Sequence, residues 1–133
     1  MIENMVVNLE LSKELKRLGM PQKSEFWWSN FHYIEHAGLI KNEHFMIGYG
    51  QDADYLEDEH IGLGYEQYSA YLSDELLRWL PAFTNIMFNE QEYCIQADYA
   101  EYHKEYDKSL PNTLAKLLIY LITNGLLKVE GLR

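Results

Sequence analysis

The sequence predicts an α+β domain, in which an antiparallel sheet of about four to six strands carries two or three helices packed on it. Leucine patterns at helical spacing stand at both ends of the chain, over residues 12–18 and in a C-terminal helix at 110–124. Between them runs a series of aromatic and β-branched segments separated by turn residues. Strands in a run with helices outside them are typical of this class.

The size and composition suit one globular domain spanning residues 1–133, since 47% of the residues are hydrophobic. The longest apolar run, residues 117–122, is far shorter than the roughly 20 residues that cross a bilayer. The first residues lack the basic and apolar parts of a secretory signal, and the single cysteine, Cys94, cannot form an internal disulfide. We therefore expect a protein of the reducing cytosol.

The first helix is predicted over residues 12–18. Leu15 and Leu18 lie on one face with Leu11, and Gly19 followed by Pro21 ends the pattern. The apolar residues around its start also fit a short strand: Val6, Val7, Leu9 and Leu11.

Strands are predicted next. Residues 24–36, SEFWWSNFHYIEH, read as one or two strands broken near Ser29-Asn30. Ala37-Gly38 marks a turn, and residues 39–49 offer one more strand. Residues 48–68 mix glycines with acids and predict a long, irregular acidic loop.

The second helix is predicted to start at Ser73, which reads as its N-cap. Asp74 and Glu75 follow where the helix dipole favours anions, and Pro81 ends the helix. Its apolar face consists of Leu76, Leu77 and Leu80.

A hairpin follows, with residues 86–88 and 93–95 joined across Asn89-Glu90-Gln91. Residues 99–106 are ambiguous. Tyr102, Lys104 and Tyr106 alternate as in a strand, whereas the tyrosines alone also fit a helix face. We favour the strand.

The C-terminal helix is predicted most directly. Ser109 is its cap, Pro111 is tolerated in the first turn, and Asn124-Gly125 gives a left-handed end. A wide apolar stripe predicts that it is the main core helix: Leu110, Leu114, Leu117, Leu118, Leu121 and Ile122.

Charge is concentrated in the middle of the chain. Between Gln51 and Asp107 lie 14 of the 21 acidic residues, 8 of the 11 tyrosines and only two basic residues, Arg78 and Lys104. A net charge of −10 argues against direct binding of nucleic acid or of a membrane surface, both of which need clustered cations. Acid with tyrosine instead suits docking on a basic protein.

Residues 32–36, HYIEH, spell the inverted zinc-peptidase pattern HxxEH. That site needs both histidines one helical turn apart, so that they hold one metal ion. The surrounding residues predict a strand, in which His32 and His36 lie roughly 13 Å apart. We therefore expect no metal and no cofactor here, and a metal-dependent hydrolase is kept as an alternative.

Other chemical motifs are incomplete. The acids from Asp52 to Glu59 lack the glycine and the terminal glutamate of a calcium loop. The patterns GxGxxG, GxxxxGK[ST] and GxSxG do not occur. Cys94 stands between Tyr93 and Ile95 in a predicted strand, where a buried small hydrophobe is expected.

Aromatic residues exceed what one small core absorbs. Adjacent strand residues point to opposite faces, so one of Trp27 and Trp28 should face solvent or a partner unless helices cover both faces. The surplus set is Trp27, Trp28, Tyr55, Tyr65, Tyr68 and Tyr71.

Three segments carry a resemblance: LSKELKRLGMPQKSEFWW at 11–28, YLSDELLRWLP at 71–81 and SLPNTLAKLLIYLITNGLL at 109–127. In order and spacing they resemble a group of small uncharacterised proteins encoded by phages, prophages and other mobile elements of bacteria. The matching residues are helix caps and core leucines, so the resemblance implies a shared fold. It also implies a setting in the bacterial cytoplasm and a role as an accessory factor that neutralises host machinery.

We therefore expect a non-enzymatic protein that occludes a basic surface of a host defence protein. A first alternative is an oligomeric sponge that holds a small nucleotide signal between aromatic residues such as Trp27, Trp28 and Tyr65. Its phosphate would meet the one cluster of cations near the first helix: Lys13, Lys16, Arg17 and Lys23. The predicted partner-binding residues are Asp52, Asp54, Tyr55, Glu57, Asp58, Glu59, Tyr65 and Tyr68.

Overall fold

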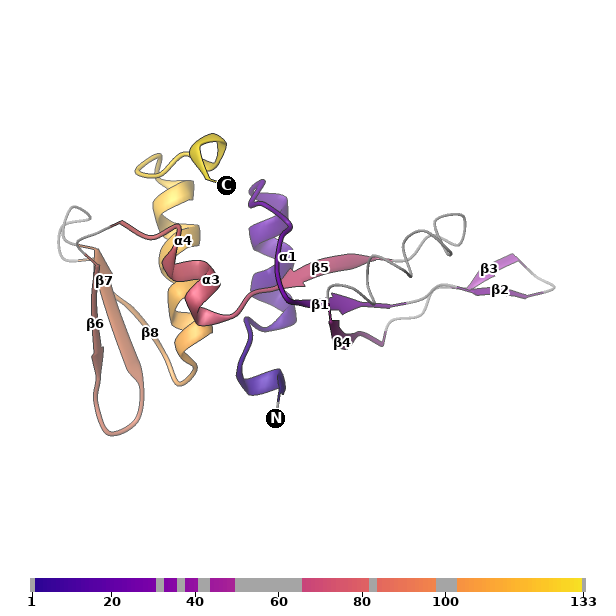
Figure 1. Cartoon of the computed structure of the whole chain (residues 1–133), viewed down its shortest axis with the longest axis horizontal. Coiled ribbons are helices and arrows are strands. Elements are labelled where there is room, and N and C mark those ends of the chain that lie inside the picture. The colour runs from indigo at the N-terminus through magenta and orange to yellow at the C-terminus, as the bar shows by residue number, and fades with distance from the viewer. Residues whose placement is uncertain are drawn as a thin grey trace.

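A computed structural model describes residues 2–30, 33–35, 38–40, 44–49, 66–81, 84–97 and 103–132. The fold is α+β, as predicted, and the C-terminal helix is present (Figure 1). The elements in chain order are η1 (Ile2–Asn4), α1 (Leu9–Arg17), β1 (Phe26–Ser29), β2 (Tyr33–Glu35), β3 (Gly38–Ile40), β4 (Met46–Tyr49), β5 (Gln67–Ala70), α3 (Ser73–Leu77), β6 (Thr84–Phe88), β7 (Tyr93–Ala97), β8 (Glu105–Asp107), α4 (Leu110–Thr123) and η4 (Val129–Gly131).

The described strands are all antiparallel and are divided among separate sheets, where the sequence suggested a single sheet. Two sheets have three strands, in the orders β4-β1-β5 and β6-β7-β8, and β2 pairs with β3 alone. The helices α1 and α4 lie between the two larger sheets, with α1 on β5 and α4 on β7 and β8 (Figure 1). The separation arises because α3 and the buried residues Trp79 and Leu80 pack into the core between β5 and β6.

The main core forms around α4, whose apolar stripe is buried as predicted. Leu114, Leu117, Leu118 and Leu121 are fully buried and pack with residues from α1, α3 and β7. A second, smaller cluster lies under the β4-β1-β5 sheet and is formed by Val6, Phe26 and Ala70. The helix ends follow the predicted chemistry, since Ser109 Oγ accepts from Asn112 N at 3.3 Å and Gly125 has a φ of +71°.

The N-terminal prediction needs a correction. α1 begins at Leu9, so Leu9 and Leu11 are helical and do not continue a strand. Asn8 is the N-cap, and its Oδ1 accepts from Leu11 N at 2.9 Å. Only Val6 makes a β-bridge, to Leu72. The amide side chain of Asn8 therefore sets the N-terminal end of α1.

The second helix is shorter than predicted and is capped differently. α3 ends at Leu77, and Ser73 lies inside the helix because Leu72 occupies the N-cap position. The carboxylate of Glu75 caps the helix, since its Oε1 accepts from Leu72 N at 2.8 Å. Its Oε2 accepts from Glu25 N at 3.0 Å and so ties the segment before β1 to α3. Burial raises the pKa of Glu75 above its usual range, although these backbone donors lower it.

The other strand predictions are confirmed in part: residues 39–49, predicted as one strand, belong to two, and of the strand predicted at 99–106 the described residues 103–106 are extended into β8 only from Glu105. The break at Ser29-Asn30 separates β1 from β2. Glu66 N donates to Asn30 Oδ1 at 2.8 Å, and Asn30 N donates to Glu66 O at 3.2 Å. The region 39–49 contributes two strands, the end of β3 and the whole of β4. The hairpin β6–β7 and the strand β8 are present, and residues 98–102 lie outside the described part.

Candidate protein-binding site

The acidic patch predicted from the sequence falls almost entirely outside the described residues. This holds for Asp52, Asp54, Tyr55, Glu57, Asp58, Glu59 and Tyr65. Tyr68 is described, and it lies half-buried on β5. That these residues form one surface therefore stays a prediction.

Tyr68 lies beside basic side chains. Lys13 and Lys16 of α1 place their Nζ atoms 5.8 Å and 5.2 Å from its ring centroid, and Lys13 also lies over the ring of Phe45 at 5.0 Å. Burial raises the pKa of Tyr68, and neighbouring Glu66 adds to this effect. Lys16 in addition donates to Gln67 O at 2.8 Å. Three of the four cations considered for a nucleotide phosphate are thus engaged with the protein itself, since Arg17 pairs with Glu14.

The two tryptophans do not divide into one buried and one exposed ring. Trp27 and Trp28 are both half-buried. Trp28 packs against the smaller core cluster, and its Nε1 donates to Val7 O at 2.9 Å. α1 and the chain before it lie on the face of Trp28, since Lys13 and Lys16 contact Tyr68, which pairs with Trp28 in the register. Trp27 points to the opposite face of the sheet, and its contact with a partner stays a prediction.

The HxxEH segment behaves as a strand where it is described. Its middle residues form β2 and pair with β3, with Glu35 opposite Gly38. His32 and His36 lie outside the described residues. Among the residues that are described, no three His, Cys, Asp or Glu side chains group as a metal site would require.

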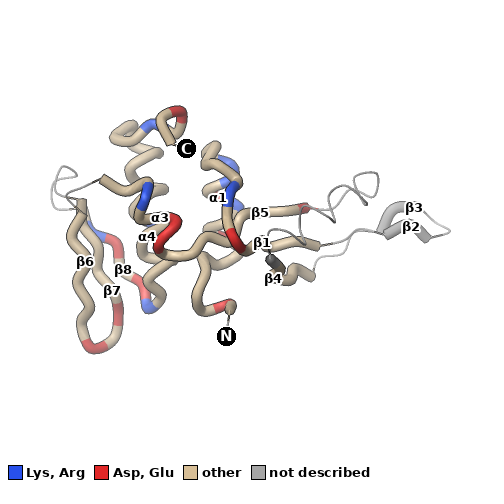
Figure 2. The backbone as a smooth tube through the Cα atoms, in the orientation of Figure 1, with Lys and Arg blue, Asp and Glu red and all other residues tan. Residues whose placement is uncertain are grey.

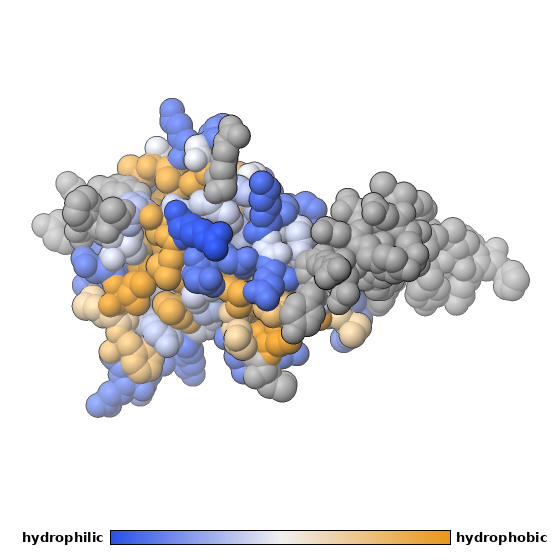
Figure 3. All heavy atoms as spheres, viewed as in Figure 1, coloured by the Kyte–Doolittle hydropathy of each residue, from blue (hydrophilic) through white to orange (hydrophobic). Residues whose placement is uncertain are grey.

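The hairpin strand β6 exposes a row of apolar side chains. Ile86, Met87 and Phe88 are 41%, 50% and 62% exposed, and no residue of β6 is charged. Phe88 rests on Tyr93 of β7, with ring centroids 4.7 Å apart. α4 packs on β7 and β8, so β6 projects beyond the helix layer. Figure 3 shows apolar surface gathered at this end of the molecule.

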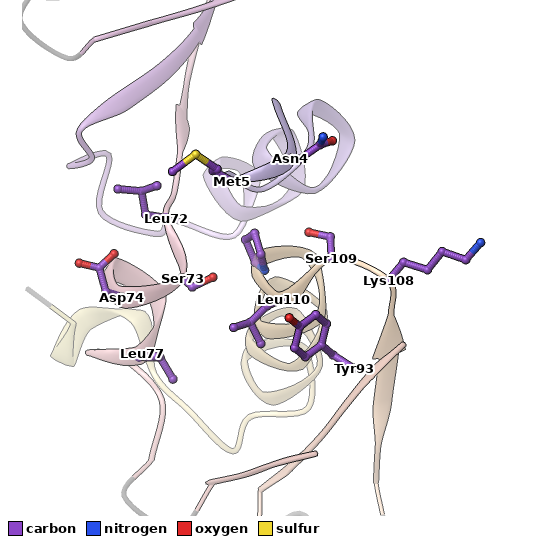
Figure 4. A pocket seen from close by; sticks show the side chains of 11 residues that line it. Asn4, Met5, Leu72, Ser73, Asp74, Leu77, Tyr93, Lys108, Ser109 and Leu110 are labelled. Atoms are coloured by element: carbon purple, nitrogen blue, oxygen red, sulfur yellow. The ribbon is translucent and has the colours of Figure 1, made fainter. Parts of the chain in front are cut away.

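A recess of about 540 Å³ reaches the hairpin at Tyr93 of β7 (Figure 4). Leu77 of α3 and Tyr93 of β7 stand on opposite sides of it, with Leu110 of α4 between them. Met5 and Leu72 close one end, and both Met5 and Leu77 are exposed. The recess and the exposed face of β6 share Tyr93, because this ring lines the recess and also supports Phe88. Together they form one apolar surface, which we call the hairpin surface: Met5, Leu77, Ile86, Phe88 and Tyr93. Met87 is exposed on the opposite face of β6.

Acidic groups border the hairpin surface. Glu90 and Glu92 lie at the tip of the hairpin, and Asp74 lies at the rim of the recess (Figure 2, Figure 4). Lys108 also lines the recess, but its side chain extends away from it in Figure 4. An apolar centre with a charged border is the usual make-up of a protein–protein interface.

Asp107 holds the wall of the recess in place. Its Oδ1 accepts from Ser109 N and its Oδ2 accepts from Lys116 Nζ, both at 2.8 Å. Burial alone would raise the pKa of Asp107, but these donors hold it below its usual range. The carboxylate thereby fixes the turn from β8 into α4, and Ser109 and Leu110 of this turn line the recess.

We expect Asp107→Asn to lower the free energy of unfolding by about 1–2 kcal/mol at neutral pH, because a charged acceptor of two hydrogen bonds is lost. The stabilisation is complete above the unfolded pKa of about 4 and disappears as the pH falls through the lower folded pKa. Urea unfolding of both proteins at neutral and at strongly acidic pH measures this. The two curves should converge in acid; an equal gap at both pH values would contradict the role of the charge.

Comparisons of the chain with protein-family models, curated proteins and solved structures find no match. Within the described part of the chain, no helix has both the length and the apolar character needed to cross a membrane. The sequence predicts the hairpin but not the exposure of its first strand. The available signal was three consecutive large apolar residues, 86–88, which must place apolar groups on both faces of the strand.

Proposed function

We propose that this protein acts by binding, without catalysis, as a phage-type accessory protein in the bacterial cytoplasm. It docks on a host defence protein and covers a basic, nucleic-acid-binding surface of that partner. The observation that supports this proposal is the exposure of Ile86, Met87 and Phe88 on an uncharged strand beside an apolar recess. A contiguous, exposed apolar surface with a polar border is typical of an interaction site.

The two kinds of surface have different tasks in this proposal. The acids of residues 52–59, with Asp74, Glu90 and Glu92, attract a basic partner and raise the rate of association. The hairpin surface then holds the complex, because apolar and aromatic contacts that exclude water set the dissociation rate.

The test uses a partner that is first captured from the host and then purified. Replacing Ile86 and Phe88 together by threonine keeps β propensity and removes the apolar contact. We expect the affinity to fall about 30-fold or more, as for hot-spot residues worth about 2 kcal/mol. Titration calorimetry with the purified partner measures this loss.

A matched control changes apolar residues of similar exposure elsewhere. Met46 and Leu126 are 65% and 45% exposed and are not part of the hairpin surface. The double variant Met46→Thr, Leu126→Thr should bind as the original protein does. If the hairpin variant keeps full affinity while circular dichroism shows it to be folded, the proposed binding surface is wrong.

A further inference from the structure

Among the described strands, β6 lies at the edge of its sheet. In the described part of the chain it pairs with β7 on one side and with no strand on the other. Asn89 N donates to Glu92 O at 3.0 Å, and the register places Phe88 opposite Tyr93. Hydrogen-bonded and non-bonded pairs alternate in antiparallel strands, so Asn85 and Met87 bond to β7 while Ile86 and Phe88 direct their N–H and C=O groups outward.

The same alternation fixes where the side chains lie. Ile86 and Phe88 pair with Ile95 and Tyr93 in the register and share their face of the sheet. Ile95 is buried in the main core and Tyr93 lines the recess, so this face is the one toward the helices. A strand added to β6 would place the residues opposite Ile86 and Phe88 on that face, next to the recess.

We propose that β6 accepts an extended segment of the partner protein as a fourth strand of the β6-β7-β8 sheet. This inference rests on the proposed function and adds its mode of recognition. The segment carries apolar residues at alternate positions, which pack on Ile86 and Phe88 and enter the recess. A lysine or arginine flanks them, because Asp74, Glu90 and Glu92 border the surface with negative charge.

Charge also decides between a foreign segment and a second copy of this chain. The strand β6 is uncharged and could pair with itself, but the hairpin tips carry Glu90 and Glu92, and each chain has a net charge of −10. Two copies would bring like charge together, whereas a basic segment is attracted. A dimer formed through β6 is therefore a distinct outcome of the test.

The first probe is a synthetic peptide with valine at alternate positions, threonine between them and lysine at both ends. The control peptide has the same composition with valine at helical spacing. We expect the alternating peptide to bind more tightly by at least about tenfold, and to protect the amide protons of Ile86 and Phe88 from hydrogen exchange. Equal binding of both peptides, or protection that is absent from these two amides, would overturn strand addition.

The second probe separates the contribution of the backbone N–H group of residue 88 to binding from that of its side chain. Phe88→Ala keeps the outward N–H group, whereas Phe88→Pro removes it without breaking a bond to β7. Against the alternating peptide, and against the purified partner, Phe88→Pro should bind about tenfold more weakly than Phe88→Ala. Ile86→Pro and Ile86→Ala repeat the comparison if Phe88→Pro does not fold.

The outcomes distinguish the two proposals. If the Ile86 and Phe88 threonine variant loses the partner but the proline and alanine variants bind equally, the binding function stands and strand addition is wrong. If the threonine variant keeps the partner, the proposed function itself fails. A dimer seen by sedimentation, with the same two amides protected in the absence of peptide, would replace the foreign segment by a second copy.

Discussion

Replacing Tyr71 by alanine is expected to lower the free energy of unfolding by about 3–5 kcal/mol, as for other large aromatic residues in a core. The side chain is fully buried in the main cluster, and its ring meets Trp79 edge to face, with centroids 5.4 Å apart at 89°. Because domains of this size are stable by about 5–15 kcal/mol, this one substitution removes a large share of the total.

The hydroxyl of Tyr71 makes a separate contribution. It donates to Pro21 O and accepts from Gln22 Nε2 at 3.1 Å, and Gln22 Oε1 in turn accepts from Ser69 N at 2.9 Å. Burial raises the pKa of Tyr71, so the phenol is neutral at physiological pH. Tyr71→Phe should cost about 1–2 kcal/mol, because the Pro21 carbonyl loses its buried donor.

Urea unfolding followed by tryptophan fluorescence measures both Tyr71 variants. Phe88→Ala serves as the control for removal of an aromatic ring, since Phe88 is 62% exposed and its loss should cost about 0.5 kcal/mol or less. A cost for Tyr71→Ala as small as that of the control would show that the ring is not a core residue.

Tyr71 also shows what the sequence could not decide. The sequence places it in the set of aromatic residues that exceeds what one core absorbs, yet it is a central core residue. Its position depends on the turn from β5 into α3, where Val7 N donates to Tyr71 O at 2.9 Å and draws the N-terminal segment over it. Such contacts join residues far apart in the chain, and local pattern contains no information about them.

The elements that were predicted well are those whose signals are local. The cap at Ser109, the leucine stripe of α4 and the left-handed Gly125 define that helix within one segment of sequence. The hairpin β6–β7 is also predicted by a local signal, the turn residues 89–91 between two apolar segments. The division of the strands into separate sheets was not, because it depends on where Trp79 and Leu80 pack.

The candidate site on the hairpin was not predicted from the sequence. The sequence indicated a protein-binding surface of acids and tyrosines, and the hairpin surface was missed. A run such as 86–88 looks the same whether a helix covers both faces or neither, since strand propensity reports β geometry and not burial. Only the packing of α4 on β7 and β8 leaves β6 uncovered.

Neutralising the acids of residues 52–59 should slow association with the basic partner and leave dissociation nearly unchanged. The variant replaces each acid by its amide: Asp52→Asn, Asp54→Asn, Glu57→Gln, Asp58→Asn and Glu59→Gln. The association rate should fall about tenfold or more at low salt, because long-range attraction is lost, and its dependence on salt should weaken. Stopped-flow mixing with the purified partner at low and high salt measures both rates. Neutralising the exposed residues Glu3, Glu10 and Glu130 is the control and should change the association rate less.

The threonine variant of Ile86 and Phe88 should show the opposite kinetic pattern. Its dissociation rate should rise about 30-fold or more, while its association rate stays within about threefold, since short-range apolar contacts form after the encounter. Each surface thus has its own kinetic effect, and the role proposed for each can be refuted independently of the other. An unchanged association rate for the amide variant would remove the acids from the mechanism and leave the hairpin surface. An unchanged dissociation rate for the threonine variant would mean that the complex is held by residues other than β6.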